Sequence, residues 1–457
     1  MLRIELIRWR ILRLPVFLQL PNKIFSIKLL HDQSGRSSAW IRASRGADAL
    51  GKVVVTECSG RLFVNLCLLL GSGASIPAGI PTLKDITEQV LSGKGVMRDS
   101  FDIYIFGRRE CLGHEIPDEF VPKIVAFLQV LRAEIDHYFS KYDLGTPSYE
   151  DMHYVVTQLY DSLYCEFDNP VVEPLLQKIN PDVTRIAQEN TGIYGQWRLD
   201  KFVWEAKKYI PDVVWQMLSK RPTCWDHLGC ILAACRDPAF TKVDLVTLNH
   251  DIVIETCFRE NATSLIDGFE EARNGFRLWN PRLYNSNEAR LRLFKVHGSI
   301  DWFRFRRPGS LCEGDLIGII SGHDFAHPGG PNGEELEHTE GRPLILVGTF
   351  NKMWQYTHNI YAELFCRFYN TLKDADSLLI SGYGFHDKGI NARIIEWFYS
   401  APHRKLVVVD PRASTIKDSA RPAISRQWDM WKQAGRLVEV ECGIDQTSWE
   451  SIRAYLA

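Results

Sequence analysis

Polar residues that could carry out chemistry follow two apolar runs of strand length. Asn249 and Asp251 come directly after residues 243–248, and His297 follows residues 291–296. An amide can orient a water molecule or a ribose hydroxyl, and a carboxylate can accept a hydroxyl hydrogen bond or favour a nearby positive centre. An imidazole with an ordinary pKa of about 6.5 suits a general base near neutral pH. Asn249, Asp251 and His297 are therefore the candidate catalytic residues.

Each of these candidates also has a purely structural explanation. Asn249 can form a turn and Asp251 can cap a helix over residues 252–258, and a lone histidine is often structural. In extended backbone Asn249 and Asp251 point the same way, so His250 is expected to point away from them.

A turn of small residues ends the apolar run 62–70. It reads Gly71-Ser72-Gly73-Ala74-Ser75, and an amphipathic stretch begins near residue 82. Strand, tight turn and helix form the opening unit of nucleotide-binding α/β folds. Glycines let the backbone approach a diphosphate, and free N–H groups at the helix start would face it. Ile76 replaces the third glycine of G-x-G-x-x-G, so the dehydrogenase fingerprint is not met.

Two further strand ends carry candidate binding residues. Gly382, Tyr383 and Gly384 follow residues 377–380 and would suit close contact with a phosphate or a ribose. Asp410 follows residues 405–409 and could hold the hydroxyls of an adenosine ribose. The structural alternatives are an ordinary strand-to-helix connection for the glycines and a helix cap or Asp-Pro turn for Asp410.

These clusters require parallel strands whose carboxyl ends share one edge, which predicts an α/β fold with a Rossmann-like, doubly wound parallel sheet. The apolar run 344–347 also resembles a strand. A large helical insertion is expected at about 94–237, with helices over 121–138, 149–164, 171–186, 197–218 and 224–235. Residues 309–342 read as a long loop or lid, and helices are predicted over 353–372 and 389–399. The catalytic domain thus spans 59–411, and residues 412–457 form a helical tail.

Composition narrows the functional classes. A chain of 457 residues with a formal net charge of −2 offers no global argument for binding nucleic acid or a membrane. No apolar run approaches the roughly 20 residues that span a bilayer. The 11 cysteines include no CxxC pair, so a disulfide scaffold or zinc site is not favoured, and thiols in a reducing cytoplasm are expected. His323, His327 and His338 lack supporting ligands, so no metal is expected. His250, His323, His327 and His386 are taken as surface or hydrogen-bonding residues.

Residues 1–58 differ from the rest, because they are rich in arginine and poor in acidic residues. A transit peptide has that composition. The simpler explanations, which we favour, are a flexible and possibly disordered basic arm, or translated sequence upstream of the natural start.

Four motifs in order, GSGAS with GIP, LVTLNHD, KVHGSIDW and SGYGFHD, resemble the sirtuin-like NAD-utilising domains. The resemblance covers about residues 62–411 and is closest to the bacterial NAD-hydrolysing effectors of anti-phage defence. It implies NAD bound across the sheet and cleavage of its nicotinamide–ribose bond. By motif position, Asn249 and Asp251 would order the ribose and the attacking water, and His297 would be the general base. The implied NAD-binding residues are Gly71, Ser72, Gly73, Ala74, Ser75, Gly298, Ser299, Gly382, Tyr383 and Asp410.

The departures from sirtuin deacylases are informative. Their zinc module carries paired CxxC motifs, which this chain lacks, and the helical insertion is additional. Both differences favour hydrolysis of NAD to ADP-ribose and nicotinamide over protein deacylation, in an abortive-infection effector that must be gated. The resemblance further implies a cytoplasmic homo-oligomer and a separately encoded partner, such as a HerA-type ATPase or a short Argonaute. No sensor domain is evident after Asp410.

Two rival functions use the same fold. A protein deacylase or ADP-ribosyltransferase would need an acyl-peptide groove or an acceptor, and NAD consumption without an acyl substrate would distinguish it from a hydrolase. A non-catalytic NAD or ADP-ribose sensor would need neither Asn249 nor His297. A nucleic-acid module ranks last, since no basic stripe with interleaved aromatic residues stands out.

Overall fold

The computed structural model describes residues 16–20, 23–31, 37–43, 52–53, 65–111, 114–116, 118–142, 145–164, 169–189, 196–286, 289–310, 315–320, 329–349 and 351–456. The chain divides into two compact units, Met1–Arg61 and Leu62–Ala457. In the first unit, an antiparallel sheet has the order β1-β2-β3-β4, with strands Val16–Leu20, Lys23–His31, Ser37–Ala43 and Lys52–Val53. The rest of the predicted basic arm lies outside the described residues, as do His323 and His327.

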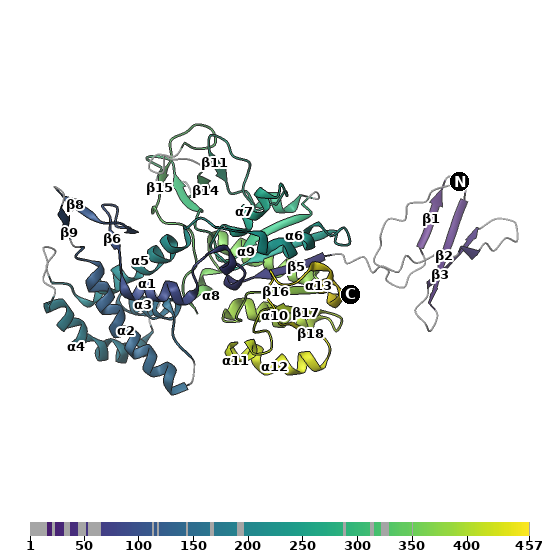
Figure 1. Cartoon of the computed structure of the whole chain (residues 1–457). Coiled ribbons are helices and arrows are strands. Elements are labelled where there is room, and N and C mark those ends of the chain that lie inside the picture. The colour runs from purple at the N-terminus through teal and green to yellow at the C-terminus, as the bar shows by residue number, and fades with distance from the viewer. Residues whose placement is uncertain are drawn as a thin grey trace. The chain divides into compact units, whose positions relative to one another are not determined.

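The second unit is built on a six-stranded sheet in which all strands are parallel (Figure 1). Its order is β12-β10-β5-β16-β17-β18, and the strands are Leu291–Lys295, Lys242–Thr247, Asn65–Leu70, Ser377–Ser381, Lys405–Val409 and Leu437–Val440. The predicted fold class is confirmed. Leu70 is in register with both Thr247 and Ser381, so the strand ends that carry the motifs are level with one another.

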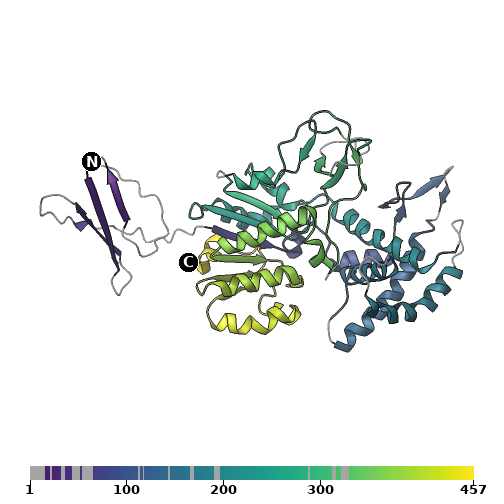
Figure 2. The same cartoon turned by 180° about the vertical axis from the view of Figure 1, so that it is seen from behind.

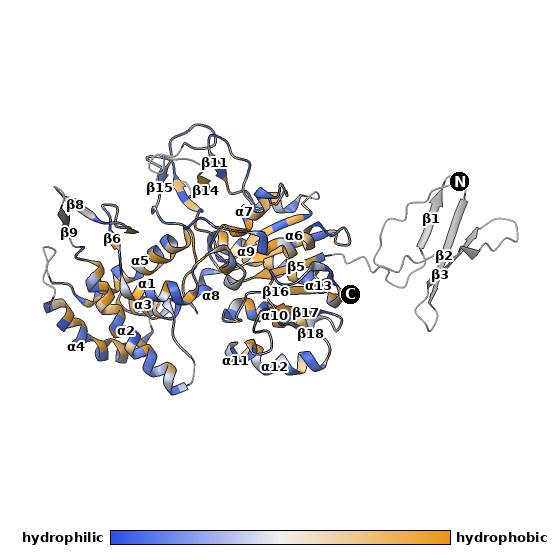
Figure 3. Cartoon of the chain, viewed as in Figure 1, coloured by the Kyte–Doolittle hydropathy of each residue, from blue (hydrophilic) through white to orange (hydrophobic). Residues whose placement is uncertain are grey.

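Both faces of this sheet are buried, which explains the uninterrupted apolar runs in its sequence. Leu66, Leu68 and Leu70 of β5 face one core, whereas Cys67 and Leu69 face the other. The strands of the sheet are accordingly drawn mostly in the hydrophobic colour in Figure 3. The helices outside the insertion are α7 (Val253–Glu260), α8 (Asn351–Gln355), α9 (Asn359–Asp374), α10 (Lys388–Ser400), α11 (Ile416–Ser419), α12 (Pro422–Gln433) and α13 (Trp449–Leu456).

The chain between β5 and β10 is mostly helical, as predicted. It contains α1 (Leu83–Ser92), α2 (Val121–Tyr142), α3 (Tyr149–Tyr164), α4 (Glu173–Glu189), α5 (Leu199–Leu218) and α6 (Gly229–Arg236). Two short antiparallel strand pairs were not predicted, because three-residue strands leave no readable alternation: β6 (Val96–Arg98) with β7 (Tyr104–Phe106), and β8 (Arg109–Cys111) with β9 (His114–Ile116). Helices α2 to α5 gather beside the sheet in opposite views (Figures 1 and 2).

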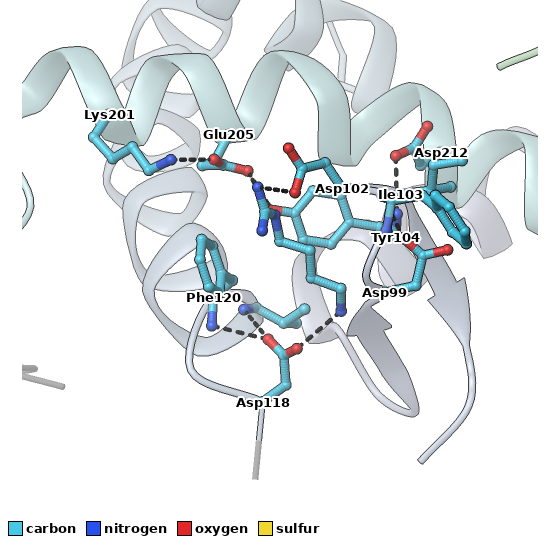
Figure 4. A network of polar contacts seen from close by, with 12 residues as sticks. Asp99, Asp102, Ile103, Tyr104, Asp118, Phe120, Lys201, Glu205 and Asp212 are labelled. Atoms are coloured by element: carbon cyan, nitrogen blue, oxygen red, sulfur yellow. Dashed lines mark hydrogen bonds and ion pairs between the residues drawn. The ribbon is translucent and has the colours of Figure 1, made fainter. Parts of the chain in front are cut away.

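A buried polar network fastens the β6–β7 hairpin to α5 (Figure 4). The hydroxyl of Tyr104 donates to Glu205 Oε2 at 2.5 Å, and its backbone N–H donates to Asp212 Oδ2 at 2.9 Å. Arg342 in turn donates to both carboxylate oxygens of Asp212 at 2.7 and 2.8 Å. The ion pair between Arg342 and Asp212 connects the helical insertion to the segment that leads into residues 344–346.

Several sequence predictions after residue 300 need correction. Residues 344–347 are not a strand of the sheet; Ile345 makes one antiparallel bridge to Gly298, and the apolar character of the segment reflects burial of Leu344 and Leu346. The predicted loop 309–342 contains two strands of an antiparallel sheet of order β11-β14-β13-β15, with strands Phe276–Leu278, Leu316–Ile320, Phe303–Arg306 and Glu337–His338.

The carboxyl-terminal half holds two further differences. The helix predicted over 353–372 is broken between α8 and α9, where Asn359 has a left-handed φ of 49°. Residues 412–457 are not only helical, since β18 extends the sheet beside β17. Among the described helices, none has the length and apolar character needed to cross a bilayer.

Candidate active site

A cleft of about 1420 Å³ lies at the carboxyl edge of the sheet and continues between the insertion helices. Small-molecule sites commonly have about 300–1,000 Å³, so the cleft has room for a dinucleotide. Its walls include seven predicted site residues: Gly71, Ser72, Asn249, Asp251, His297, Gly382 and Tyr383. The other six predicted residues do not line the cleft: Gly73, Ala74, Ser75, Gly298, Ser299 and Asp410.

The first glycine turn uses most of its N–H groups within the protein. Gly71 donates to the carbonyl of Ser381 at 2.9 Å, and Gly73 donates to that of Gly382 at 3.0 Å. The N–H groups of Ala74 and Ser75 close short 3-10 turns onto Gly71 and Ser72. The expected phosphate cradle from Gly73 to Ser75 is therefore engaged with the protein's own carbonyls in this structure.

The glycines allow two backbone turns to touch. A Cβ atom on Gly71 would lie 2.5 Å from the carbonyl oxygen of Gly382, and one on Gly382 would lie 2.3 Å from the backbone nitrogen of Ala74. Gly382 also has a left-handed φ of 66°. The small residues of both motifs thus fix the turns at the ends of β5 and β16 against each other.

Gly382→Ala is expected to destabilise the protein by about 2–4 kcal/mol, since the left-handed backbone and the clash each cost about 1–3 kcal/mol. Gly309→Ala is the matched control, because Gly309 also has a positive φ of 74° but a Cβ atom there meets open space. Chemical denaturation of both variants measures the difference. Equal loss of stability in the two would contradict the proposed contact between the turns.

Asn249 connects the ends of β10 and β5. Its Nδ2 group donates to the carbonyl of Gly71 at 2.9 Å and to Ser75 Oγ at 2.8 Å. The side chain is buried, with 6% of the residue exposed, and lies in the wall of the cleft. Because both Nδ2 donors have partners inside the protein, its carbonyl oxygen is the group suited to bind a hydroxyl or a water.

Asp251 lies two residues further along the same wall. Its Oδ1 atom accepts the N–H of Val253, the first residue of α7, at 3.0 Å, so the side chain supports the start of the helix although Ile252 holds the N-cap position. Lys295 lies behind it, donating to the backbone carbonyl of Asp251 and to Glu255 Oε1 at 2.7 Å. Asp251 is therefore held rigidly at the cleft.

The turn after β12 places His297 in the wall. Gly298 has a left-handed φ of 82°, and a Cβ atom there would lie 2.0 Å from the carbonyl oxygen of Leu344. Ser299 donates its N–H to Leu344 at 2.9 Å, and Leu346 donates its N–H to His297 at 2.9 Å. Gly298 and Ser299 thus position His297, and the segment once predicted as a strand fixes this turn.

The imidazole of His297 meets two residues from other elements. Its Nε2 atom lies 2.7 Å from the hydroxyl of Tyr356 and 3.3 Å from Asp387 Oδ2. Tyr356 donates its hydroxyl to the same carboxylate oxygen at 2.9 Å, and Asp387 Oδ1 accepts the N–H of Ile390 at the start of α10. Tyr356 occupies the break between α8 and α9, which directs its ring toward the site.

Burial sets the charge states of this group. It lowers the pKa of His297, as does the positive charge of Lys352, while Asp387 opposes both. Burial alone would raise the pKa of Asp387, but its close contact with His297, the charge of Lys352 and the N–H of Ile390 hold it well below its usual range. Near neutral pH the carboxylate is therefore ionised and the imidazole neutral.

The hydrogen bonds around His297, Tyr356 and Asp387 include more acceptor atoms than there are protons to donate. A neutral imidazole has one N–H. The backbone of Leu248 bonds one ring nitrogen, and Nε2 faces Tyr356, so we assign the N–H to Nδ1. The single hydroxyl proton of Tyr356 then serves two acceptors, Nε2 and Asp387 Oδ2. A proton arriving at Nε2 would complete the network, as is expected of a general base supported by a carboxylate.

A family model described as SIR2-like domain matches residues 243–431. The matched stretch carries Asn249, Asp251, His297 and Asp387. This match supports a sirtuin-like domain. Comparison with curated proteins gave no match.

Several solved structures are similar to this chain. A Sir2 homologue mutant in complex with ADP-ribose is 12% identical, over 86% of this chain and 91% of that chain, with a TM-score of 0.32. A Sir2 homologue in complex with NAD is 11% identical, with the same coverage and a TM-score of 0.31. A Sir2 bound to acetylated peptide is 11% identical, over 85% and 92%, with a TM-score of 0.30. The family match, and not these distant similarities, supports the sirtuin-like domain.

The candidate site includes residues that the sequence patterns did not single out. Tyr356 lay within an expected continuous helix over 353–372 and Lys352 just before it, so neither carried a signal, and Glu150 lies in the insertion. Asp387 stood in the SGYGFHD motif after a strand, where its position two residues before the predicted helix 389–399 could have identified it. Lys352 donates to both carboxylate oxygens of Glu150 at 3.1 and 3.2 Å, in the cleft wall.

Other predicted residues have structural partners. The hydroxyl of Tyr383 donates to Asn391 Oδ1 at 2.9 Å, which holds the loop before α10. Asp410 Oδ1 accepts the N–H of Arg412 at 2.9 Å, so the turn interpretation is seen there. Within the described residues, no group of three or more His, Cys, Asp or Glu side chains is arranged to hold a metal.

Two of the histidines expected to serve other roles lie at the cleft of the sirtuin-like domain. His250 is buried there, contrary to a surface position, and its ring centroid is 6.0 Å from that of His297. His386 is an exposed cleft residue. His338 lies away from the cleft in β15, against Phe303 and Phe305.

Proposed function

We propose that the protein is an NAD glycohydrolase that cleaves the nicotinamide–ribose bond of NAD, giving ADP-ribose and nicotinamide. The observation that carries this proposal is the network of His297, Tyr356 and Asp387, which is one proton short and stands at the wall of a dinucleotide-sized cleft. A binding protein would not need a buried base of this kind beside a polar amide.

The cleft offers suitable groups for the substrate. The carbonyl oxygen of Asn249 would accept a hydrogen bond from the attacking water or a ribose hydroxyl, and Asp251 would favour positive charge that develops on the ribose. Gly71, Ser72, Gly382 and Tyr383 would line the phosphate-bearing part of NAD. These assignments agree with those that the sirtuin resemblance implies for the same positions.

The proposed reaction balances in atoms and electrons. The bond between the anomeric carbon and the pyridinium nitrogen breaks, and its electron pair leaves with nicotinamide, which becomes neutral. The oxygen of water bonds the anomeric carbon, and its proton passes to Nε2 of His297 and then to solvent. Asp387 stabilises the imidazolium, and the rigid walls of the cleft supply positioning and electrostatic stabilisation.

The acid limb of the pH–rate profile is expected to lie below pH 6.5, because burial and Lys352 lower the pKa of His297 and keep its base form at lower pH. Lys352→Met removes the positive charge and is expected to move this limb to higher pH. Steady-state rates of wild type and variant from pH 5 to 8 measure the shift.

The Lys352 substitution leaves Glu150 without its ion-pair partner in the cleft wall. The matched control is therefore the double variant Glu150→Gln with Lys352→Met. In this variant neither residue carries a charge, so no buried carboxylate is left without a partner. The acid limb of the pH–rate profile should move to higher pH in this variant too. Loss of rate at every pH with an unmoved limb would indicate that Lys352 acts only on structure.

We further propose that the enzyme is an abortive-infection effector that depletes NAD in the cytoplasm when phage triggers it. The family resemblance supports this role, together with a homo-oligomeric assembly and a separately encoded partner such as a HerA-type ATPase or short Argonaute. Infecting cells that carry the protein and its genomic neighbours tests the proposal. NAD should fall after infection with wild type and persist with His297→Ala, and unchanged NAD in both would oppose the defence role.

A further inference from the structure

The outer end of the cleft, beyond β16 and β17, carries two arginines and a histidine. Arg412, Arg421 and His386 form what we call the basic corner, and all three line the cleft. The Nε group of Arg421 donates to the backbone carbonyl of His386 at 3.0 Å, which connects two sides of the corner. The side chain of Arg412 is 80% exposed, and its Nε lies 4.0 Å from Asp410.

The residue expected to bind an adenosine ribose is turned away from this space. Asp410 is 8% exposed, its Oδ1 atom accepts the N–H of Arg412, and it does not belong to the cleft wall. The neighbouring guanidinium of Arg412 takes its place there. In dinucleotide-binding folds, an acidic residue near the ribose binds the 2′-hydroxyl of NAD, whereas an arginine accommodates the 2′-phosphate of NADP.

We propose that the preferred dinucleotide carries a 2′-phosphate, so that NADP is the better ligand, with Arg412 and Arg421 binding that phosphate. The inference rests on the proposed function, since it assumes that this cleft binds a nicotinamide dinucleotide. Guanidinium groups bind phosphate oxygens in bidentate fashion, and two of them match a dianionic group better than one.

The charges around the corner agree with an anionic ligand. His386 is exposed in the cleft, but the atoms packed around its ring still desolvate it enough to lower its pKa. The charges of Arg421 and Arg412 lower this pKa further and Asp151 opposes them, so both guanidinium groups lie close enough to act on the same imidazole. Lys388 also lines this end, and Asp418 and Asp151 are the acidic residues there. Thr415, Ser419 and Ser425 also line this wall, although the hydroxyls of Thr415 and Ser419 donate to the backbone carbonyls of Arg412 and Ile416.

Calorimetric titration of the full chain with ADP-ribose and with 2′-phospho-ADP-ribose tests the inference without turnover. Wild type should bind the 2′-phosphorylated ligand at least about 10-fold more tightly. Arg412→Ala and Arg421→Ala should each weaken that binding about 10- to 100-fold and change ADP-ribose binding by less than about 3-fold. Arg426→Ala is the matched control, because Arg426 is an exposed arginine on α12 outside the cleft wall.

Tighter binding of ADP-ribose than of its 2′-phosphorylated form would overturn the inference and leave the proposed function intact. Equal losses for both ligands in Arg412→Ala and Arg421→Ala would also overturn it, since the arginines would then contact the shared pyrophosphate. Failure to bind either ligand would overturn the inference together with the dinucleotide site on which the proposed function depends.

Discussion

Replacing His297 with alanine is expected to lower NAD hydrolysis by about 1,000-fold, within the range that a positioned general base contributes. The variant removes the only group in the network that can accept the proton of water at Nε2, while Asp387 and Tyr356 keep their mutual hydrogen bond. Nicotinamide release under saturating NAD measures the effect.

The control for this substitution is His403→Ala. His403 is an exposed histidine, 3.1 Å from Asp376, so it resembles His297 in having a carboxylate partner but lies outside the cleft. Its loss should leave turnover within about twofold of wild type, as is usual for surface substitutions. A His297→Ala enzyme that retains most of its activity and its thermal midpoint would remove His297 from the mechanism.

Asp387→Asn is expected to reduce turnover by about 100-fold or more, because the imidazolium would lose its ionised partner. Asparagine can still accept the N–H of Ile390 at the start of α10, so the helix cap is retained. The carboxylate raises the pKa of His297, and its removal should therefore move the acid limb of the pH–rate profile to lower pH.

This pH shift distinguishes positioning and electrostatic support from simple structural damage. Asp376→Asn, at the exposed carboxylate beside His403, is the matched control and should change neither rate nor profile. A reduced rate in Asp387→Asn with an unmoved acid limb would contradict the electrostatic role of Asp387.

The sequence was sufficient for five of the six strands of the sheet because both faces of the sheet are buried. Each strand is an apolar run that ends abruptly in polar or small residues, and parallel strands bring such ends to one edge. Asn249, Asp251 and His297 could be selected on that basis, and the structure places all three in the cleft wall. β18 was missed because its residues, Leu437–Val440, are mostly only partly buried at the edge of the sheet.

The partners of His297 depend on contacts that local patterns do not record. Tyr356 enters the site because the helix breaks just before the left-handed Asn359, and the pattern of apolar residues continues through that break. Lys352 and Glu150 are about 200 positions apart in the chain and meet only when the insertion packs on the sheet. The orientation of Asp410 was decided by a hydrogen bond to Arg412, which a strand-end pattern cannot distinguish from a ligand contact.

The most direct test of the account is the fate of NAD incubated with purified protein at a comparable concentration, so that even low basal activity is measurable. Products are separated by chromatography for wild type, Asn249→Ala and His297→Ala, with no acylated peptide present. We expect nicotinamide and ADP-ribose in equal amounts from wild type and almost none from either variant. NAD that is bound but recovered intact, or consumed only after an acylated peptide is added, would contradict hydrolysis as the function of this cleft.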